Sequence, residues 1–263
     1  MRQQRLTALL ELVSERGHVS VTDVADALEV SEATARRDIS QLAEQRLLTR
    51  THGGATALGS SYELPLQYKI SRQADAKLAI ARAAAALLRP GMAIAMNGGT
   101  TTTEVARAIG RSPDLSADGC ITVVTNALNI AYELSIRPNV VIVVIGGTAR
   151  SQSYELVGPL SDGVLDRVNV EAAVLGVDGI TPDGITTVHP AEAQLSAELI
   201  RVAARVIVVA DNTKLGRSTF ARIAPLDAVD QLITDLPVDG SLADDLAAAG
   251  VEVVIADGAA PAH

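Results

Sequence analysis

From residue 72 onward, short runs of apolar residues alternate with segments of helical periodicity, and this alternation limits the fold more than any other feature. An alternating pattern predicts a mostly parallel sheet covered by helices on both faces. Because aromatic residues make up only 2% of the chain, its core must be built from Ala, Val, Leu and Ile. Strands are expected at Met92–Met96, Ile121–Thr125, Val140–Ile145, Ala172–Val177, Val206–Ala210, Gln231–Thr234 and Val251–Ile255. Helices are expected at Asp75–Leu88, Thr101–Ile109, Ala127–Ser135, Ala191–Ala203 and Leu242–Ala249.

The first 57 residues have a different character, with three short helical patterns followed by a turn-rich tail. Gly17 is placed to end the first helix, and Ser20 and Ser31 are placed to cap the second and third. The Gly53-Gly54 pair separates two short extended runs, which predicts a small β wing. We therefore expect a winged helix-turn-helix over residues 1–57, a linker over 58–72 and an α/β domain over 73–258.

The third helix and the wing carry the candidate DNA-binding residues. A recognition helix packs on its domain with one face and reads the major groove with another, where arginine can donate two hydrogen bonds to a guanine. The net charge of −9 counts mildly against nucleic acid as a partner, although DNA binding needs only a local basic face. The alternative is an ordinary helical domain with a solvated arginine face. The candidates are Ser31, Thr34, Arg36, Arg37, Ser40, Arg50 and His52.

A glycine- and threonine-rich loop follows the first expected strand of the α/β domain. Glycines let the backbone approach an anion, and the free N–H groups of a helix start can donate to phosphate oxygens. The alternative is a plain strand-to-helix turn with a threonine cap. Other polar or glycine-containing loops follow the later strands, and in an open α/β sheet such loops converge on one crevice. The candidate ligand residues are Gly98, Gly99, Thr100, Thr101, Thr102, Asn126, Gly146, Gly147, Asp178 and Lys214, of which Lys214 would supply positive charge unless it is simply solvated.

The segments SEATARRDISQL (residues 31–42) and THGGA (residues 51–55) resemble the signature of the DeoR family of bacterial transcription regulators. The segments GGTTTTEVA, VVTNALNIA, VIGGTARSQS, VGP, LGVDGI and DNTKLGR follow in the order of that family's effector domain. The resemblance implies a double-stranded DNA operator as a partner and a repressor of carbohydrate genes. It also implies a C-terminal domain similar in fold to ribose-5-phosphate isomerase and glucosamine-6-phosphate deaminase, a phosphorylated sugar bound at Gly99–Thr102, Asn126, Gly146-Gly147 and Lys214, and a homodimer or homotetramer.

Two positions depart from the family pattern. Asn97 stands where the family usually has Asp, and Ser196 stands where it commonly has Lys. Losing a lysine removes a possible phosphate partner, so the charge would be left to Lys214 and backbone N–H groups.

A sugar-phosphate isomerase is the rival function, because Asp178, Asp211 and Glu192 could each supply a base. Asn97 cannot act as a base. Because a DNA-binding domain is joined to the α/β domain, a sensor role for the pocket is also simpler than an enzymatic one. A pure interaction module would leave the threonine loop and the arginine helix unexplained. We expect no catalytic residues, no cofactor and no metal, since the four histidines and Cys120 form no ligand-spaced cluster. The single cysteine and the absence of a signal peptide or membrane-length apolar run predict a cytoplasmic protein without a membrane partner.

Overall fold

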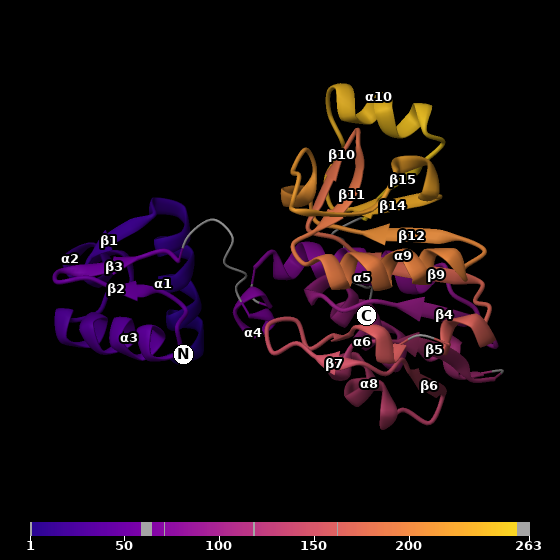
Figure 1. Cartoon of the computed structure of the whole chain (residues 1–263), viewed down its shortest axis with the longest axis horizontal. Helices are drawn as coiled ribbons and strands as arrows, with labels where there is room; N and C mark the ends of the chain where they lie inside the picture. The colour runs from indigo at the N-terminus through magenta and orange to yellow at the C-terminus, as the bar shows by residue number, and fades with distance from the viewer. Residues whose placement is uncertain (1, 59–64, 71, 118, 162, 257–263) are drawn as a thin grey trace. The chain divides into compact units, whose positions relative to one another are not determined.

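The computed structural model describes residues 2–58, 65–70, 72–117, 119–161 and 163–256. The chain divides into two compact units, residues 1–72 and 73–263, and each is described by itself (Figure 1).

The first unit is a winged helix-turn-helix. Gly17, with a φ of 71°, ends the first helix as expected, because the left-handed region suits glycine. Ser20 and Ser31 cap the second and third helices through their side chains. Its elements are α1 (Arg2–Arg16), β1 (His18–Ser20), α2 (Val21–Ala27), α3 (Glu32–Glu44), β2 (Thr49–Arg50), β3 (Gly54–Thr56) and α4 (Leu66–Lys69). The strands form an antiparallel sheet in the order β1-β3-β2.

Part of the segment expected as a linker packs on this first unit. Helix α4 lies within it, and Tyr68 is buried in the unit's hydrophobic core. The Tyr68 hydroxyl donates to Oε1 of Gln45 at 2.7 Å, and Arg72 pairs with Glu11 at 2.9 Å. Residues 65–70 and Arg72 therefore contribute contacts to the first unit, whereas residues 59–64 and 71 lie outside the described chain.

The second unit is built on one large parallel sheet. The seven strands expected from the sequence all lie in it, and every neighbouring pair among the described residues is parallel. The predicted α/β fold is therefore confirmed. The strands are β4 (Ala93–Met96), β5 (Ile121–Thr125), β6 (Val140–Val144), β9 (Ala172–Gly176), β12 (Val206–Val209), β14 (Gln231–Thr234) and β15 (Glu252–Ile255). The helices of this unit are α5 (Ala74–Ala86), α6 (Thr100–Arg111), α7 (Asp114–Ala117), α8 (Leu128–Ser135), α9 (Pro190–Arg201) and α10 (Ser241–Ala248).

Two smaller β structures were not expected from the sequence. They are the sheet of β10 (Gly179–Thr181), β11 (Gly184–Thr187) and β13 (Ala221–Ala224), and the hairpin of β7 (Thr148–Ala149) and β8 (Leu156–Val157). The hairpin connects β6 to β9 and contributes to the site described below.

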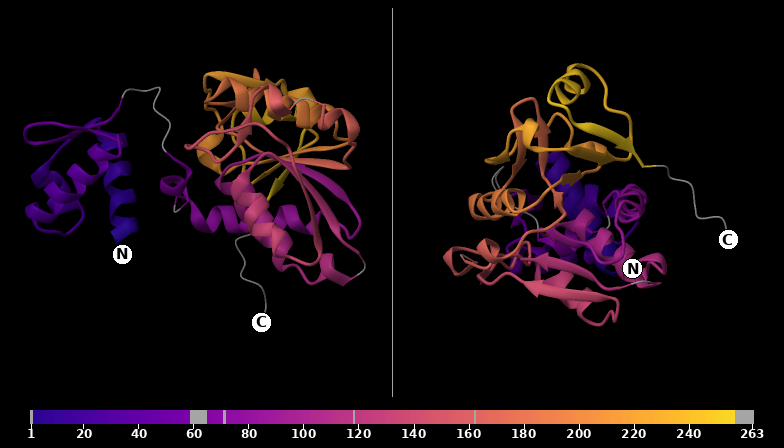
Figure 2. Two further views of the ribbon diagram at one scale, coloured as in Figure 1. Left: turned by 60° about the horizontal axis from the view of Figure 1, so that its bottom comes forward. Right: turned by 90° about the vertical axis from the view of Figure 1, so that its right-hand side faces the viewer.

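Alternate residues of each strand face opposite sides of the large sheet. Ile94 and Met96 pack with the core under α5, α6 and α8, whereas Ala95 packs with the core under α9 and α10. Figure 2 shows the helices on both sides of the strands. This two-sided burial explains why the strands read as nearly continuous apolar runs.

The strand order fixes where a ligand can bind. The order is β15-β14-β12-β9-β4-β5-β6. Strands β4, β5 and β6 follow one another toward one edge of the sheet, and β9, β12, β14 and β15 follow one another toward the other edge. Order reverses between these two central strands. In open α/β sheets, such a reversal opens a crevice at the carboxyl ends of the strands.

Candidate functional sites

The expected recognition helix, α3, is capped at its N-terminus by the side chain of Ser31. The Ser31 side chain accepts a hydrogen bond from the backbone N–H of Thr34 at 3.3 Å, and the two hydroxyl oxygens lie 3.0 Å apart. Both predicted residues therefore fix the start of the helix. Arg36 and Arg37 lie exposed one turn further on.

The opposite face of α3 is anchored by a buried carboxylate. Asp38 is 1% exposed and pairs with Arg5 of α1, with 2.6 Å between Nε and Oδ2. The hydrogen bond with Asp38 raises the pKa of Arg5 above its ordinary value. Because Asp38 faces inward, its neighbours Arg36 and Arg37 are directed outward. Arg36 pairs with Glu32 at 2.7 Å across an exposed surface, where such pairs contribute little and exchange readily.

The wing brings a further arginine onto this surface. A guanidinium nitrogen of Arg50 donates to Oγ of Ser40 at 2.9 Å, and Ser40 donates to the carbonyl of Arg36 at 2.8 Å. His52 lies exposed at the wing turn. The structure thus brings all the predicted DNA-binding residues onto α3 and the adjoining wing.

Gly54 is required by the packing of the wing on β1. A Cβ at this position would lie 2.8 Å from Cα of Ser20 and closer still to the carbonyl oxygen of Val19. Gly53 has open space around the same position. The two glycines of the turn therefore have different roles, and only Gly54 is there for close backbone approach.

In the second unit, Asn97 joins the two central strands at the crevice. Its Nδ2 donates to the carbonyl of Gly176 at 2.9 Å, and its Oδ1 accepts from the N–H of Gly176 at 2.8 Å. The same Nδ2 donates to Oγ of Ser196 on α9 at 3.2 Å. Asn97 is 5% exposed and Ser196 is 1% exposed. The two positions that depart from the family pattern are therefore in direct contact, as a neutral pair.

The glycine-threonine loop leads into α6 as expected. Gly99, with a φ of 131°, is the N-cap, and no side chain caps this helix. The hydroxyls of Thr102 and Thr103 donate to the carbonyl of Gly99. Thr101 and Thr102 are buried, while Thr100 is partly exposed.

The β7–β8 hairpin closes over this loop. Glu155, 5% exposed, lies against Gly98, where a Cβ would be 2.5 Å from Cγ of Glu155 and 2.7 Å from its Oε1. Nδ2 of Asn126 donates to Oε2 of Glu155 at 2.8 Å. The loops after β4 and β5 are thus brought together, with a carboxylate between them.

The remaining predicted residues lie at other strand ends. Space at Gly147 is taken by the backbone of Val157, and a Cβ at Gly146 would lie 3.2 Å from the carbonyl oxygen of Leu160. Asp178 accepts hydrogen bonds from the Thr187 hydroxyl and the Val188 N–H, which fixes the end of β11.

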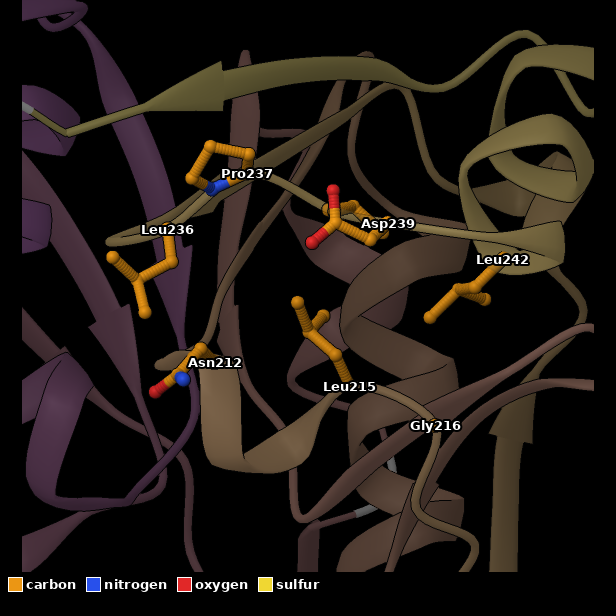
Figure 3. Close-up of a pocket in the computed structure, with 8 residues that line it drawn as sticks. Asn212, Leu215, Gly216, Leu236, Pro237, Asp239 and Leu242 are labelled. Atoms are coloured by element: carbon orange, nitrogen blue, oxygen red, sulfur yellow. The ribbon is translucent and has the colours of Figure 1, made fainter.

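Lys214 ends a short 3-10 turn, Asn212–Lys214, and is half-buried. Beside it lies a pocket of about 480 Å³. Figure 3 shows Asn212 and Leu215 on one side of this pocket and Leu236, Pro237 and Asp239 on the other. The pocket lies at the ends of β12 and β14 and has none of the predicted ligand residues in its lining.

Two charged residues of the crevice, Arg150 and Glu155, were missed by the sequence reasoning. Arg150 of the hairpin pairs with Glu192 in the first turn of α9, with 2.8 Å between Nε and Oε1. Their side chains are 16% and 6% exposed. Glu192 lies one helical turn before Ser196, so the Arg150–Glu192 ion pair and the Asn97–Ser196 contact lie on the same face of α9. Arg150 and Glu155 lie in the segment RSQSYELVGP (residues 150–159), where no periodicity indicates an inward-facing side chain.

The described ranges contain no cluster of three or more His, Cys, Asp or Glu residues able to hold a metal ion. Among the same residues, every helix is too short or too polar to cross a membrane.

Comparison with known families decides the identity of the two units. Residues 5–61 match the DeoR-like helix-turn-helix domain, and residues 72–236 match the DeoR C terminal sensor domain. The chain belongs to the DeoR family. It is therefore a DNA-binding transcription regulator, as its motifs predict.

Relatives of this DeoR-family protein align over nearly the whole chain. The transcriptional regulator GlpR of Haloferax volcanii is 36% identical over 95% of this chain and 96% of its own length. The repressor GlcR of Bacillus subtilis is 31% identical over 97% of each chain. The glycerol-3-phosphate regulon repressor of Escherichia coli is 31% identical over 89% of this chain and 91% of its own. These relatives are named as regulators and not as enzymes, so the isomerase alternative is set aside.

Solved structures match at lower similarity. Ribose 5-phosphate isomerase A from Methanocaldococcus jannaschii is 18% identical, with a TM-score of 0.41 over 54% of this chain and 55% of that one. The translation initiation factor eIF-2B from Pyrococcus horikoshii is 15% identical, with a TM-score of 0.45 over 88% and 86%.

Proposed function

We propose that this DeoR-family regulator is a cytoplasmic repressor that reads a duplex operator through α3 and the wing. The observation that carries the proposal is the exposure of Arg36 and Arg37 on a capped helix whose inner face is anchored by Asp38. Arg50, linked to Ser40, extends the same basic surface. Such a surface can hold phosphates and donate to guanine edges despite the acidic whole chain.

We also propose that a small phosphorylated sugar or polyol controls DNA affinity from the crevice between β4 and β9. The uncapped start of α6 offers N–H groups and a positive partial charge to an anion. Thr100–Thr102, Asn126 and Lys214 supply polar groups, and the hairpin adds Arg150, whose charge is paired with Glu192. A relative named for the glycerol-3-phosphate regulon supports a ligand of this class.

The proposed control requires two arrangements of the DNA-reading units. A ligand shifts DNA affinity only if it binds the two arrangements unequally. We propose that the repressor is a homodimer or homotetramer, so that several wings bind repeated half-sites. An apolar stripe supports self-association: Leu128 and Tyr132 of α8 and Ile136 at its C-cap are 41%, 78% and 71% exposed. Val141 and Val144 of the neighbouring edge strand β6 are also exposed, at 48% and 43%.

The test of DNA reading is an anisotropy titration of the protein on its own upstream DNA at fixed salt. Arg36→Ala and Arg37→Ala should each weaken binding by about 1–3 kcal/mol if the side chain pairs with a base edge. Arg82→Ala is the matched control, because it removes an exposed arginine from α5 in the other unit. Unchanged affinity in both α3 variants would remove this helix from the interface.

The test of sensing adds glycerol 3-phosphate and a panel of sugar phosphates to the same titration. Thr101→Ala and Lys214→Ala should bind DNA normally but respond only at higher ligand concentrations. A wild-type response in both variants would mean that the effector binds elsewhere.

A further inference from the structure

A carboxylate of the protein lies where the proposed effector would place its anion. Gly98 immediately precedes Gly99, the N-cap of α6. The space that a side chain at position 98 would need is filled by Glu155, whose Cγ, Oε1 and Cδ lie 2.5, 2.7 and 2.8 Å from the Cβ position. The space left by the absent side chain of Gly98 is therefore occupied by the acidic side chain of Glu155.

The surroundings of Glu155 suit an anion. The start of α6 carries a partial positive charge and no side-chain cap. Asn126, fully buried at the end of β5, donates to Oε2 of Glu155 at 2.8 Å. Asn126, a predicted ligand residue, thus donates to a carboxylate of the protein that is 5% exposed.

A second group beside Glu155 indicates a ligand. Within the part of the chain that the structure describes, Oδ1 of Asn126 has no hydrogen-bond partner, although this residue is 0% exposed. A buried acceptor without a donor is costly, and a ligand hydroxyl next to the anion would satisfy it. The expected ligand therefore combines a phosphate with a neighbouring hydroxyl.

Glu155 is coupled to elements beyond the loop. The backbone N–H of Arg150 donates to the carbonyl of Glu155, and the N–H of Tyr154 donates to the carbonyl of Arg150, which closes the hairpin tip. Tyr154 lies in the left-handed region with a φ of 61°, a conformation that surrounding contacts must maintain. Arg150 then reaches Glu192 of α9. Removing Glu155 from the loop would thus disturb the hairpin and its link to α9.

We propose that Glu155 is a built-in occupant of the effector's anion position. A phosphorylated, hydroxyl-bearing ligand binds by displacing this carboxylate, and the β7–β8 hairpin moves with it. The inference rests on the proposed sensor function and adds its regulation. Because like charges in a buried site repel, we expect a phosphate and the Glu155 carboxylate not to share the loop. The occupant therefore sets the ligand concentration at which the regulator responds.

The experiment is isothermal titration of the full chain with glycerol 3-phosphate and with inorganic phosphate, using Glu155→Gln, Glu155→Ala and wild type. Glutamine keeps the volume and can still accept from Asn126, so the fold should persist. Glu198→Gln is the matched control, because it removes one negative charge from an exposed position of α9. We expect at least tenfold tighter binding in both Glu155 variants and wild-type affinity in the control.

Hydrogen exchange provides the second readout. In the wild type, ligand should speed exchange at amides 148–157, whereas in Glu155→Ala these amides should already exchange fast without ligand. Equal or weaker phosphate binding by both Glu155 variants, with binding retained in wild type, would overturn the occupant role and leave the sensor function standing. Absence of binding in all four proteins would overturn the sensor function and this inference with it. Binding by the Glu155 variants alone would support both.

Discussion

The wing turn offers a pair of adjacent substitutions that differ only in local space. Replacing Gly54 by Ala puts a Cβ 2.8 Å from Cα of Ser20, whereas carbon atoms in contact lie about 3.5–4.0 Å apart. Strand β3 must therefore retreat from β1 by roughly 0.7 Å or more. The flanking hydrogen bonds, Val21 N–H to Gly53 at 2.8 Å and Ala57 N–H to Gly17 at 2.9 Å, would then exceed hydrogen-bonding distance.

The expected cost follows from those contacts. Two lost backbone hydrogen bonds cost about 0.5–1.5 kcal/mol each, and the overpacking adds about 1–3 kcal/mol. A destabilisation of about 3 kcal/mol corresponds to roughly a hundredfold fall in the protection of local amides. Gly53→Ala meets no atom within 4 Å and should change stability by less than about 0.5 kcal/mol.

The assay is hydrogen exchange on the full chain, followed at amides 18–20 and 54–56. Operator binding by Gly54→Ala should weaken together with this protection, because Arg50 and His52 lie on the displaced hairpin. Native exchange rates at these amides in Gly54→Ala would refute the assignment of Gly54 to close packing.

Three further predictions concern other sites. Asn97→Asp should destabilise the α/β unit by about 3 kcal/mol in urea unfolding, because the carbonyl of Gly176 loses its donor and a carboxylate is buried; an unchanged midpoint would contradict this. Hydrogen bonds from the side chain and backbone of Ser20 lower the pKa of Asp23. The capping box should therefore stabilise α2 above about pH 4 and be lost as pH falls through that lowered pKa, which an NMR titration of Asp23 would follow. Tyr132→Glu should dissociate the proposed oligomer in sedimentation velocity, and an unchanged sedimentation coefficient would exclude α8 from the interface.

Much of the fold could be predicted because the informative signals are local. Ser20, Ser31 and Gly17 act within four residues of their own position, and the apolar runs at Ile121 and Val206 mark strands buried on both faces. The β10–β11 hairpin escaped prediction because strands as short as Gly179–Thr181 have no measurable period. Strand order also escaped, since it depends on pairings between segments distant in the chain.

The candidate crevice was predicted less completely, for a physical reason. A sequence shows that a glycine leaves space, but it does not show whether a ligand or another part of the chain fills that space. At Gly98 the chain fills it with Glu155, 57 positions away, and at Gly147 with the backbone of Val157. The contact between Asn97 and Ser196, 99 positions apart, likewise follows only from the folded sheet.

The burial of Tyr68 determines how the DNA-reading half should be isolated. A fragment that stopped at residue 57 would lack the ring that fills its core and the hydroxyl that reaches Gln45. Extending the fragment through Arg72 keeps both and adds the tie to Glu11. A fragment of residues 1–72 is therefore the suitable one for studying operator binding without the sensor domain.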